Sequence, residues 1–185
     1  MDISLYYQEQ GKGEPFILLH GNGEDGTYFV NQIGFFSDQY RVIAVDTRGH
    51  GKSPRGTAPF TMEQFADDLY ELMNELQIPG AVILGFSDGA NIAMKFALKY
   101  PQKVTALILN GGNLDTKGIK RRIQIPTLVI AGTRDMIKQS HTELIAASIP
   151  DAKLAIVKGS HFIANKKPVE FNKEVGNFLN GADVR

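Results

Sequence analysis

Short apolar runs recur along the chain and alternate with longer segments in which apolar residues follow a helical period. The short runs are apolar at consecutive positions, which is typical of parallel strands that helices cover on both faces. The strands predicted from these runs are 16–19, 42–45, 81–84, 104–109, 127–130 and 154–157. Residues 3–10 are predicted to form an additional antiparallel edge strand, which turns at residues 11–13.

The longer segments predict helices. Residues 61–77 carry one apolar stripe, and Thr61 with Gln64 can form a capping box at its start. Residues 88–100 are apolar almost all round, so we expect this helix to be the most buried. The last helix presents Phe171, Val175, Phe178 and Leu179 on one face. This alternation predicts a single domain over residues 1–185, a doubly wound α/β fold with a mostly parallel sheet.

Composition narrows the classes of function. Lysine plus arginine equals aspartate plus glutamate at 20 each, so no overall field favours nucleic acid or an anionic membrane. The absence of cysteine excludes disulfides, thiolate metal sites and a cysteine nucleophile. No apolar run approaches the roughly 18 residues that span a bilayer, and the N-terminus has no signal-peptide pattern. We therefore expect a cytoplasmic protein with neither nucleic acid nor membrane as a partner.

The segment Gly85–Gly89 fits the pattern G-x-S-x-G. It follows an apolar strand and opens a helix without a spacer, which is the arrangement of a nucleophile elbow. Such a turn projects Ser87 from the carboxyl edge of the sheet, where ligands bind in doubly wound folds. The alternative is an ordinary strand-to-helix turn in which Ser87 caps the helix.

A serine hydroxyl needs a base, and the chain offers four histidines. His20 precedes a glycine-rich stretch, His50 lies within another, and His141 falls inside a predicted helix. His161 follows the last strand, at the same sheet edge as Ser87. His161 is therefore the predicted base, although a loop histidine can also be simple solvated surface.

The base in turn needs a carboxylate that fixes its tautomer. Asp135 follows the strand at 127–130, although it could equally cap the next helix. Asp115, after the preceding strand, is the rival acid. With Asp135 as the acid, the chain order is Ser87, Asp135, His161, which is the order of the α/β-hydrolases.

An oxyanion hole needs two backbone amides aimed at one oxygen. The amide of Asp88, next to the nucleophile, is one candidate, and that of Asn22 in the loop after the strand at 16–19 is the other. We expect the Asp88 carboxylate to point away, towards the helix N-terminus. Gly21 and Phe86, which neighbour these amides in the sequence, are expected to contact the substrate.

Two polar segments are interpreted without a catalytic role. Residues 46–53 lack the spacing of a phosphate-binding loop and are predicted to be a tight loop held by its own polar contacts. The basic residues Lys117, Lys120, Arg121 and Arg122 are predicted to be a solvated crossover, with binding of an anionic group as the alternative.

Together, these motifs resemble the α/β-hydrolases, in particular the group of bacterial esterases, haloperoxidase-like and proline-iminopeptidase-like proteins. The motifs that carry the resemblance are residues 20–23, 46–53, 85–89, 125–132 with Asp135, and 159–162. The resemblance implies a serine hydrolase that needs no metal or cofactor. Serine at position 87 argues against the dehalogenase and epoxide-hydrolase branches, which have an aspartate there.

One departure from this group is large. Its members usually insert a helical cap of several tens of residues where this chain has only residues 111–126, a short crossover. Either the cap is naturally absent or it has been removed. Because a cap walls the substrate pockets, we expect a shallow, open cleft that favours short acyl groups, with self-association through the uncapped face.

The predicted function is hydrolysis of small carboxylic esters through an acyl-enzyme intermediate. Related acyl transfer, perhydrolysis and C–C bond hydrolysis would use the same residues and remain alternatives. A non-catalytic, ligand-binding protein on the same fold is the alternative from a different class.

Overall fold

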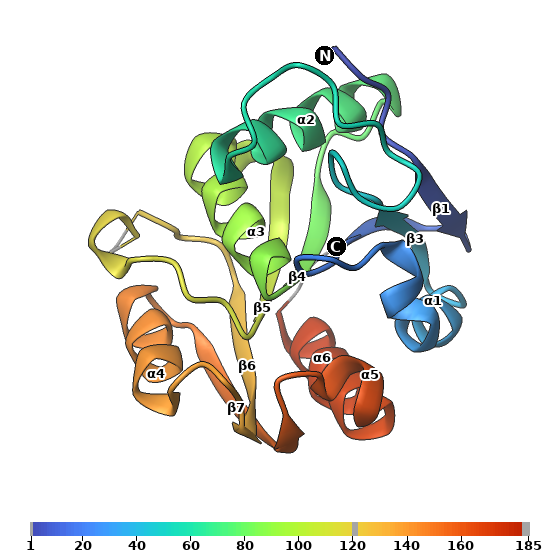
Figure 1. Ribbon diagram of the computed structural model, residues 1–185. Helices are drawn as coiled ribbons and strands as arrows, with labels where there is room; N and C mark the ends of the chain where they lie inside the picture. The colour runs from blue at the N-terminus through green and yellow to red at the C-terminus, as the bar shows by residue number, and fades with distance from the viewer. Residues whose placement is uncertain (1, 120–121, 183–185) are drawn as a thin grey trace.

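The computed structural model describes residues 2–119 and 122–182, which form a seven-stranded sheet flanked by helices (Figure 1). The strands are β1 (Tyr7–Gln10), β2 (Glu14–Leu19), β3 (Tyr40–Val45), β4 (Ala81–Phe86), β5 (Val104–Asn110), β6 (Thr127–Arg134) and β7 (Lys153–Ser160). Their order in the sheet is β1-β3-β2-β4-β5-β6-β7. β1 runs antiparallel to β3, and all the other pairs are parallel. The sheet therefore has the doubly wound, mostly parallel topology that the sequence predicts.

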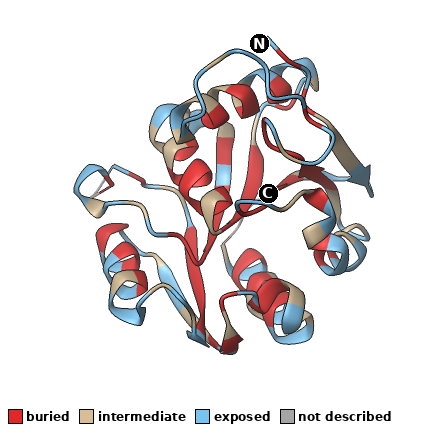
Figure 2. Cartoon of the chain, in the orientation of Figure 1, coloured by how far each residue is buried: buried red, intermediate tan, exposed pale blue. Residues whose placement is uncertain are grey.

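Helices cover both faces of this sheet. They are α1 (Val30–Phe36), α2 (Met62–Glu75), α3 (Asp88–Lys99), α4 (Gln139–Ser148), α5 (Ile163–Lys166) and α6 (Pro168–Gly181), with 3₁₀ turns η1 (Gly26–Phe29), η2 (Pro101–Lys103) and η3 (Thr116–Gly118). α2, α3 and α4 pack on one face, and α1, α5 and α6 lie together on the other. Buried residues concentrate on the strands and on the inner sides of the helices (Figure 2).

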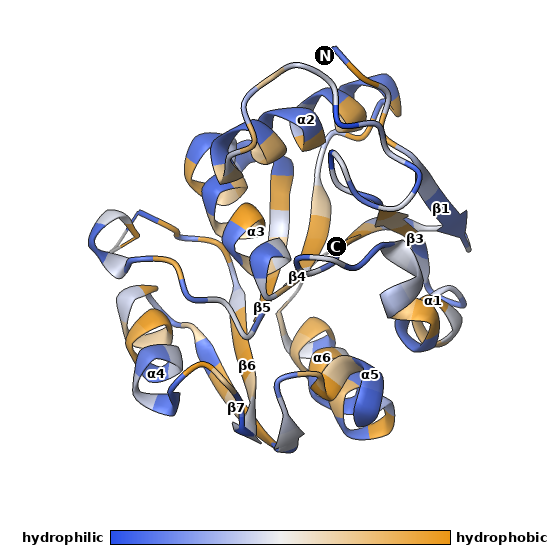
Figure 3. Cartoon of the chain, in the orientation of Figure 1, coloured by the Kyte–Doolittle hydropathy of each residue, from blue (hydrophilic) through white to orange (hydrophobic). Residues whose placement is uncertain are grey.

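Alternate residues of each strand enter the two cores. In β2, Ile17 and Leu19 join the core under α2 and α3, whereas Phe16 and Leu18 join the core under α1 and α6. A strand buried on both sides needs apolar residues at every position, which explains the continuous apolar runs of the sequence. Figure 3 shows the same arrangement, with hydrophobic strands at the centre and hydrophilic helix surfaces outside.

Several sequence predictions need adjustment. The first strand covers only Tyr7–Gln10, and α1 together with η1 follows from no predicted pattern. The capping box at α2 is half formed: Thr61 Oγ1 accepts a hydrogen bond from Gln64 N at 3.2 Å. The Gln64 side chain, however, donates to Asp68 Oδ1 at 3.0 Å and does not return to Thr61. α3 is largely buried, as predicted.

The crossover between β5 and β6 is short. Within its described residues, η3 is the helical element, and residues 120 and 121 fall outside the described part. Among the described residues, no cap domain follows β5, so the fold is a minimal core. Across residues 2–119 and 122–182, no helix is both long and apolar enough to cross a membrane.

Candidate active site

The turn between β4 and α3 holds the candidate nucleophile, Ser87. Its backbone lies at φ 53° and ψ −115°, a region that costs a non-glycine residue on the order of 1–3 kcal/mol. Ser87 N donates to Asn110 O at 2.8 Å, and Ser87 O accepts from Ala90 N at 3.0 Å, so neighbouring backbone holds the turn in place. A Cβ at Gly85 or Gly89 would overlap backbone oxygens, which explains the two glycines of the motif. The segment has the geometry expected of a nucleophile elbow.

The candidate base and acid meet at the ends of β7 and β6. His161 Nδ1 and Asp135 Oδ1 are 2.7 Å apart, and the two side chains are 5% and 2% exposed. Asp135 Oδ1 also accepts from Ile137 N at 2.9 Å. Because Asp135 accepts at Oδ1, we assign the imidazole proton to Nδ1, which leaves Nε2 as a potential proton acceptor.

The ionisation of Asp135 follows from this pairing. Burial of the carboxyl acts to raise its pKa, but the hydrogen bonds from His161 and from the Ile137 amide outweigh that effect. The net result is a lowered pKa, so the carboxylate stays ionised at neutral pH. An ionised acid beside the imidazole is what stabilises a positive charge on the ring.

Gly111, at the end of β5, packs directly against this pair. Its backbone has φ +64°, which glycine adopts without strain. A Cβ at this position would lie 2.7 Å from His161 Cε1 and 2.9 Å from His161 Nδ1. The same Cβ would lie 3.4 Å from Asp135 Oδ2. The absence of a side chain at position 111 thus leaves room for the imidazole.

The loop after β2 supplies backbone amides near Ser87. Gly21 N donates to Glu24 Oε2 at 3.1 Å, so this amide is already occupied. The Asn22 amide makes no hydrogen bond to another described residue, and that of Asp88, first in α3, has no acceptor within the helix. Asn22 and Asp88 therefore remain the candidate oxyanion donors. The Asp88 carboxylate lies along α3, with Oδ1 3.5 Å from Asn91 Nδ2.

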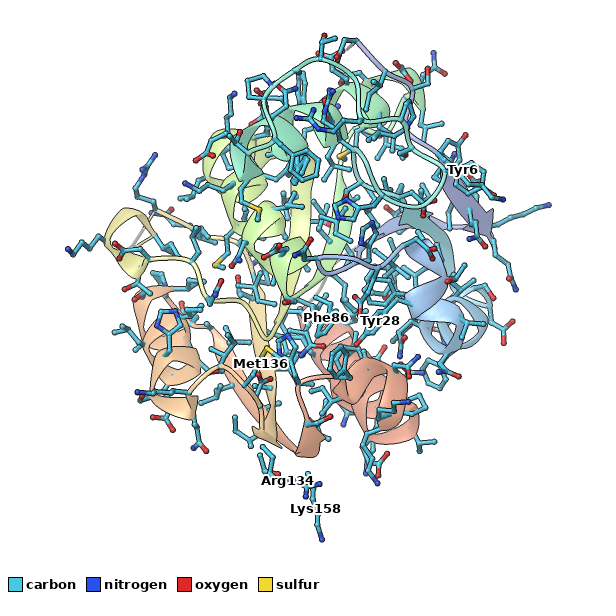
Figure 4. The ribbon with its side chains drawn as sticks, viewed as in Figure 1. Tyr6, Tyr28, Phe86, Arg134, Met136 and Lys158 are labelled. Carbon is cyan, nitrogen blue, oxygen red and sulfur yellow. The ribbon has the colours of Figure 1, made fainter. Side chains whose placement is uncertain are left out.

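A cleft of about 310 Å³ opens above Ser87. It is lined by Gly21, Asn22, Glu24, Phe86, Ser87, Asp88, Met136, His161 and Phe162. Figure 4 shows Phe86 and Met136 in the middle of the molecule, where the carboxyl ends of the strands meet, with Tyr28 beside Phe86. The rings of Tyr28 and Phe86 stack at 4.5 Å. The nucleophile, base and predicted contact residues thus line one cleft.

Two other hollows differ in character. One of about 190 Å³ shares Gly21, Asn22 and Asp88 with the cleft and extends towards Phe60. Another of about 650 Å³ lies between α1 and α6, away from Ser87, and no serine or histidine lines it. Ser87 and His161 thus line the cleft of about 310 Å³ and neither of these two hollows.

His20 connects the amide-bearing loop to the loop after β3. Its Nε2 accepts from Thr47 N at 3.0 Å, and its Nδ1 lies 2.7 Å from Gly21 O, to which it donates. The ring is 1% exposed, and this burial lowers its pKa. A neutral His20 thus positions the loop that carries Asn22.

The loop at residues 46–53 has a structural role, as predicted, although its contacts extend beyond the loop. Asp46 accepts from Gly26 N at 2.7 Å and from Lys52 N at 2.8 Å. Arg48 is completely buried and pairs with Asp68 of α2 at 2.7 Å and with Asp2 at 2.6 Å.

The remaining candidates lie apart from the cleft. Asp115 is exposed and caps η3 through a 3.0 Å hydrogen bond from Lys117 N. His141 lies in α4, and His50 Nδ1 lies 3.1 Å from Thr47 Oγ1, so neither lines the cleft.

In the predicted basic cluster, Lys117 and Arg122 are exposed, whereas Lys120 and Arg121 fall outside the described residues. No group of three or more histidine, aspartate or glutamate side chains in the described part could hold a metal ion.

Sequence reasoning missed three cleft residues. Phe162 is part of a motif, but its lining position could not be inferred from the motif, and Met136 follows the candidate acid with no pattern around it. Glu24 is marked only by its place in the loop after β2. In each case the missing information is the direction of a loop side chain.

Comparison with known proteins agrees with the fold and the motifs. The family model described as alpha/beta hydrolase fold matches residues 14–120. The 3-oxoadipate enol-lactonase 2 of Acinetobacter baylyi is 33% identical over 110 residues, 58% of this chain and 41% of that protein. The (E)-2-((N-methylformamido)methylene)succinate hydrolase of the same organism is 29% identical over 142 residues, 76% of this chain and 51% of that protein. The matched stretch thus spans about half or less of these curated relatives.

Solved structures share the fold at low identity. A thermophilic esterase from Thermogutta terrifontis, with malate bound, aligns with a TM-score of 0.92 at 23% identity, covering 97% of this chain and 94% of that one. The enol-lactonase from Burkholderia xenovorans aligns with a TM-score of 0.90 at 21% identity, covering 96% and 97%. With the family match over more than half of its length, the chain belongs to the α/β-hydrolase family.

Proposed function

We propose that this chain is a serine hydrolase that cleaves small carboxylic esters through an acyl-enzyme intermediate. The observation that carries the proposal is the 2.7 Å pairing of Asp135 with His161, which lines the same cleft as the strained Ser87. Esterases and lactonases among the related proteins support the reaction class.

The mechanism follows from the positions of the donors and acceptors. Ser87 Oγ attacks the acyl carbon while His161 Nε2 takes its proton, and Asp135 stabilises the imidazolium through Nδ1–H. The amides of Asn22 and Asp88 hold the oxyanion. When the tetrahedral intermediate collapses, His161 gives its proton to the leaving alcohol. Water then attacks the acyl carbon, with His161 again as base, and Ser87 is released.

The test is labelling with a fluorophosphonate, followed by peptide mass spectrometry. We expect modification of Ser87 in the wild-type chain and none in Ser87→Ala, with loss of p-nitrophenyl acetate hydrolysis in both the labelled protein and the variant. A folded protein whose Ser87 stays unlabelled would favour the ligand-binding alternative.

The size of the cleft supports short acyl groups. At about 310 Å³ it lies at the lower end of ligand pockets, and no cap covers it. Each buried methylene contributes about 0.8 kcal/mol, which an open cleft largely forgoes. We expect kcat/KM for p-nitrophenyl esters to stay level or fall from acetate to octanoate. A steep rise with chain length would contradict the open cleft.

The same residues would also support perhydrolysis, other acyl transfer and C–C bond hydrolysis. These reactions differ in the nucleophile or the leaving group and use the same serine chemistry. Screening peroxide, alcohol acceptors and β-diketones beside esters separates them.

A further inference from the structure

The charges that line the cleft have one sign. Among its lining residues, Glu24 and Asp88 are acidic, and neither a lysine nor an arginine contributes to the lining. The Asp88 carboxylate lies along α3 towards Asn91, whereas Glu24 comes from the loop opposite. Glu24 is therefore the acidic group to consider beside the reacting atoms.

The contacts of Glu24 leave one carboxylate oxygen available. Oε2 accepts from Gly21 N at 3.1 Å, and Oε1 has no hydrogen bond within residues 2–119 and 122–182. Half-burial of the carboxyl raises its pKa, partly opposed by the Gly21 amide and by His161, and Asp25 raises it further. A carboxylate that is desolvated without a cation partner gains from a positively charged ligand.

The basic residues on the neighbouring strands do not supply that partner. Arg134 in β6 and Lys158 in β7 project outwards from the last two strands of the sheet, at the bottom of the view in Figure 4. They lie away from Phe86 and Met136. In the described part of the chain, the cleft thus has no lysine or arginine side chain in its lining.

Phe162 adds an aromatic ring to the same cleft. Phe162 is 39% exposed, and its ring centre lies 5.5 Å from that of His161. The face of an aromatic ring attracts quaternary ammonium groups, with an effect that is modest at exposed sites. Carboxylate and ring together suit a cation with an apolar surface.

From this lining we propose that the cleft prefers esters that carry a positive charge, recognised by Glu24 with Phe162 as the apolar wall. This inference rests on the proposed ester hydrolysis and specifies its substrate class. Glu24 is then a specificity-determining residue, and anionic esters are disfavoured by the same charge.

The test compares acetylcholine with 3,3-dimethylbutyl acetate, which has the same shape and no charge. Each kcat/KM is divided by the rate constant for alkaline hydrolysis of the same ester without protein, because the ammonium group by itself makes the ester more reactive. We expect the normalised ratio to favour the cationic ester by about fivefold at low salt, since half-exposed charge pairs contribute modestly. The ratio should approach one at 0.5 M salt, where screening is strong. A second arm, p-nitrophenyl esters of trimethylglycine and of 3,3-dimethylbutanoate, tells whether the charge is read on the acyl side.

Two variants assign the preference to Glu24. Glu24→Gln retains an acceptor for Gly21 N and removes the charge, so the ratio should fall to about one whatever the absolute rates. Asp25→Asn is the matched control: its carboxylate accepts from Thr27 N at 2.8 Å and does not line the cleft, so the ratio should persist.

The outcomes separate this inference from the proposed function. Equal normalised rates for both esters in the wild-type chain, or an unchanged ratio in Glu24→Gln, would overturn the charge preference alone. Failure to cleave any ester would overturn the proposed function. In that case, NMR titration with choline and with 3,3-dimethylbutanol tests the preference directly, and equal binding of the two overturns it.

Discussion

Two buried carboxylates, Asp68 and Asp135, show how similar charge pairs serve different purposes. Asp68 pairs with Arg48, and their side chains are 2% and 0% exposed. Asp135 pairs with His161, at 2% and 5%. Burial therefore does not distinguish the two pairs.

The hydrogen bonds of the two carboxylates distinguish the pairs. Asp68 accepts at both oxygens from Arg48, at 2.7 Å each, and Oδ1 also accepts from Gln64. Asp135 accepts twice at Oδ1, whereas its buried Oδ2 has no hydrogen-bond partner among the described residues. The Arg48 guanidinium keeps its protons, so its pair with Asp68 holds structure together, whereas the imidazole of His161 lines the cleft and can exchange a proton. Breaking the first should cost stability, and breaking the second should cost activity.

The largest expected effect is on activity, in His161→Ala. Without the base, Ser87 keeps its proton, and we expect kcat/KM for p-nitrophenyl acetate to fall by roughly three orders of magnitude or more. The free energy of unfolding should change less than in Asp68→Ala, because His161 lines the cleft and its removal lets water reach Asp135. His141→Ala, in α4, is the matched control and should retain activity. Normal turnover in His161→Ala would remove His161 from the mechanism.

Asp68→Ala should lose stability and largely keep its activity. It leaves the Arg48 guanidinium buried with only Asp2 as a charged partner, and removing one member of a buried pair costs about 3–5 kcal/mol. Urea unfolding measures this loss, while kcat/KM of the folded protein should change only a few-fold.

The neighbouring Asp67 provides the comparison for this variant. Asp67 pairs with Lys99 at the surface, with side chains 36% and 51% exposed, so Asp67→Ala should cost at most about 1 kcal/mol. Equal stability of the two alanine variants would show that burial of the Arg48 pair contributes nothing.

Gly111→Ala should disturb the His161–Asp135 pair from the side. The new Cβ would lie 2.7 Å from His161 Cε1, so the ring must move away from its partner, and we expect about a hundredfold loss of kcat/KM. Loss of the downfield NMR signal of the His161 Nδ1 proton would report the displacement. Gly112→Ala serves as the control, because its new Cβ would lie 3.1 Å from Ala90 Cβ and 3.2 Å from Met94 Cε and would not meet His161. An intact signal with full activity in Gly111→Ala would contradict this role.

The fold could be predicted because its signals are local. Each central strand is apolar at consecutive positions, and α2 and α6 carry their apolar faces at helical spacing, so pattern and burial coincide. α1 was missed because it is a short helix whose buried residues include Gln32, which bonds to Asn172 at 2.8 Å. A polar residue buried through a distant partner leaves no apolar pattern.

The sequence predicts those residues of the candidate site whose positions are determined by the ends of strands. Ser87, Asp135 and His161 each follow a strand of the parallel sheet, so topology alone gathers them at one edge. The direction of loop side chains is not determined in that way. Neither the contact of Glu24 with Gly21 nor the fit of Gly111 against His161 has a signature in the sequence, because both depend on loop conformation.

The smallest expected effect concerns His20. This residue connects the loop at residues 46–53, which contains Arg48, to the loop that carries Asn22. Burial disfavours the charged imidazolium, and this desolvation lowers the pKa of His20 from the ordinary 6.5. Between the folded pKa and 6.5 the unfolded chain binds more protons than the folded one, so stability rises with pH in that window. The contribution is fully present above pH 6.5 and is lost as the pH falls below it.

Urea unfolding at pH 7.5 and 5.5 should therefore show a larger loss of stability in the wild-type chain than in His20→Gln, which cannot titrate there. The contributions of His141 and His161, which do not act on His20, cancel in this difference. Equal losses would mean that His20 does not couple the loops through its neutral form.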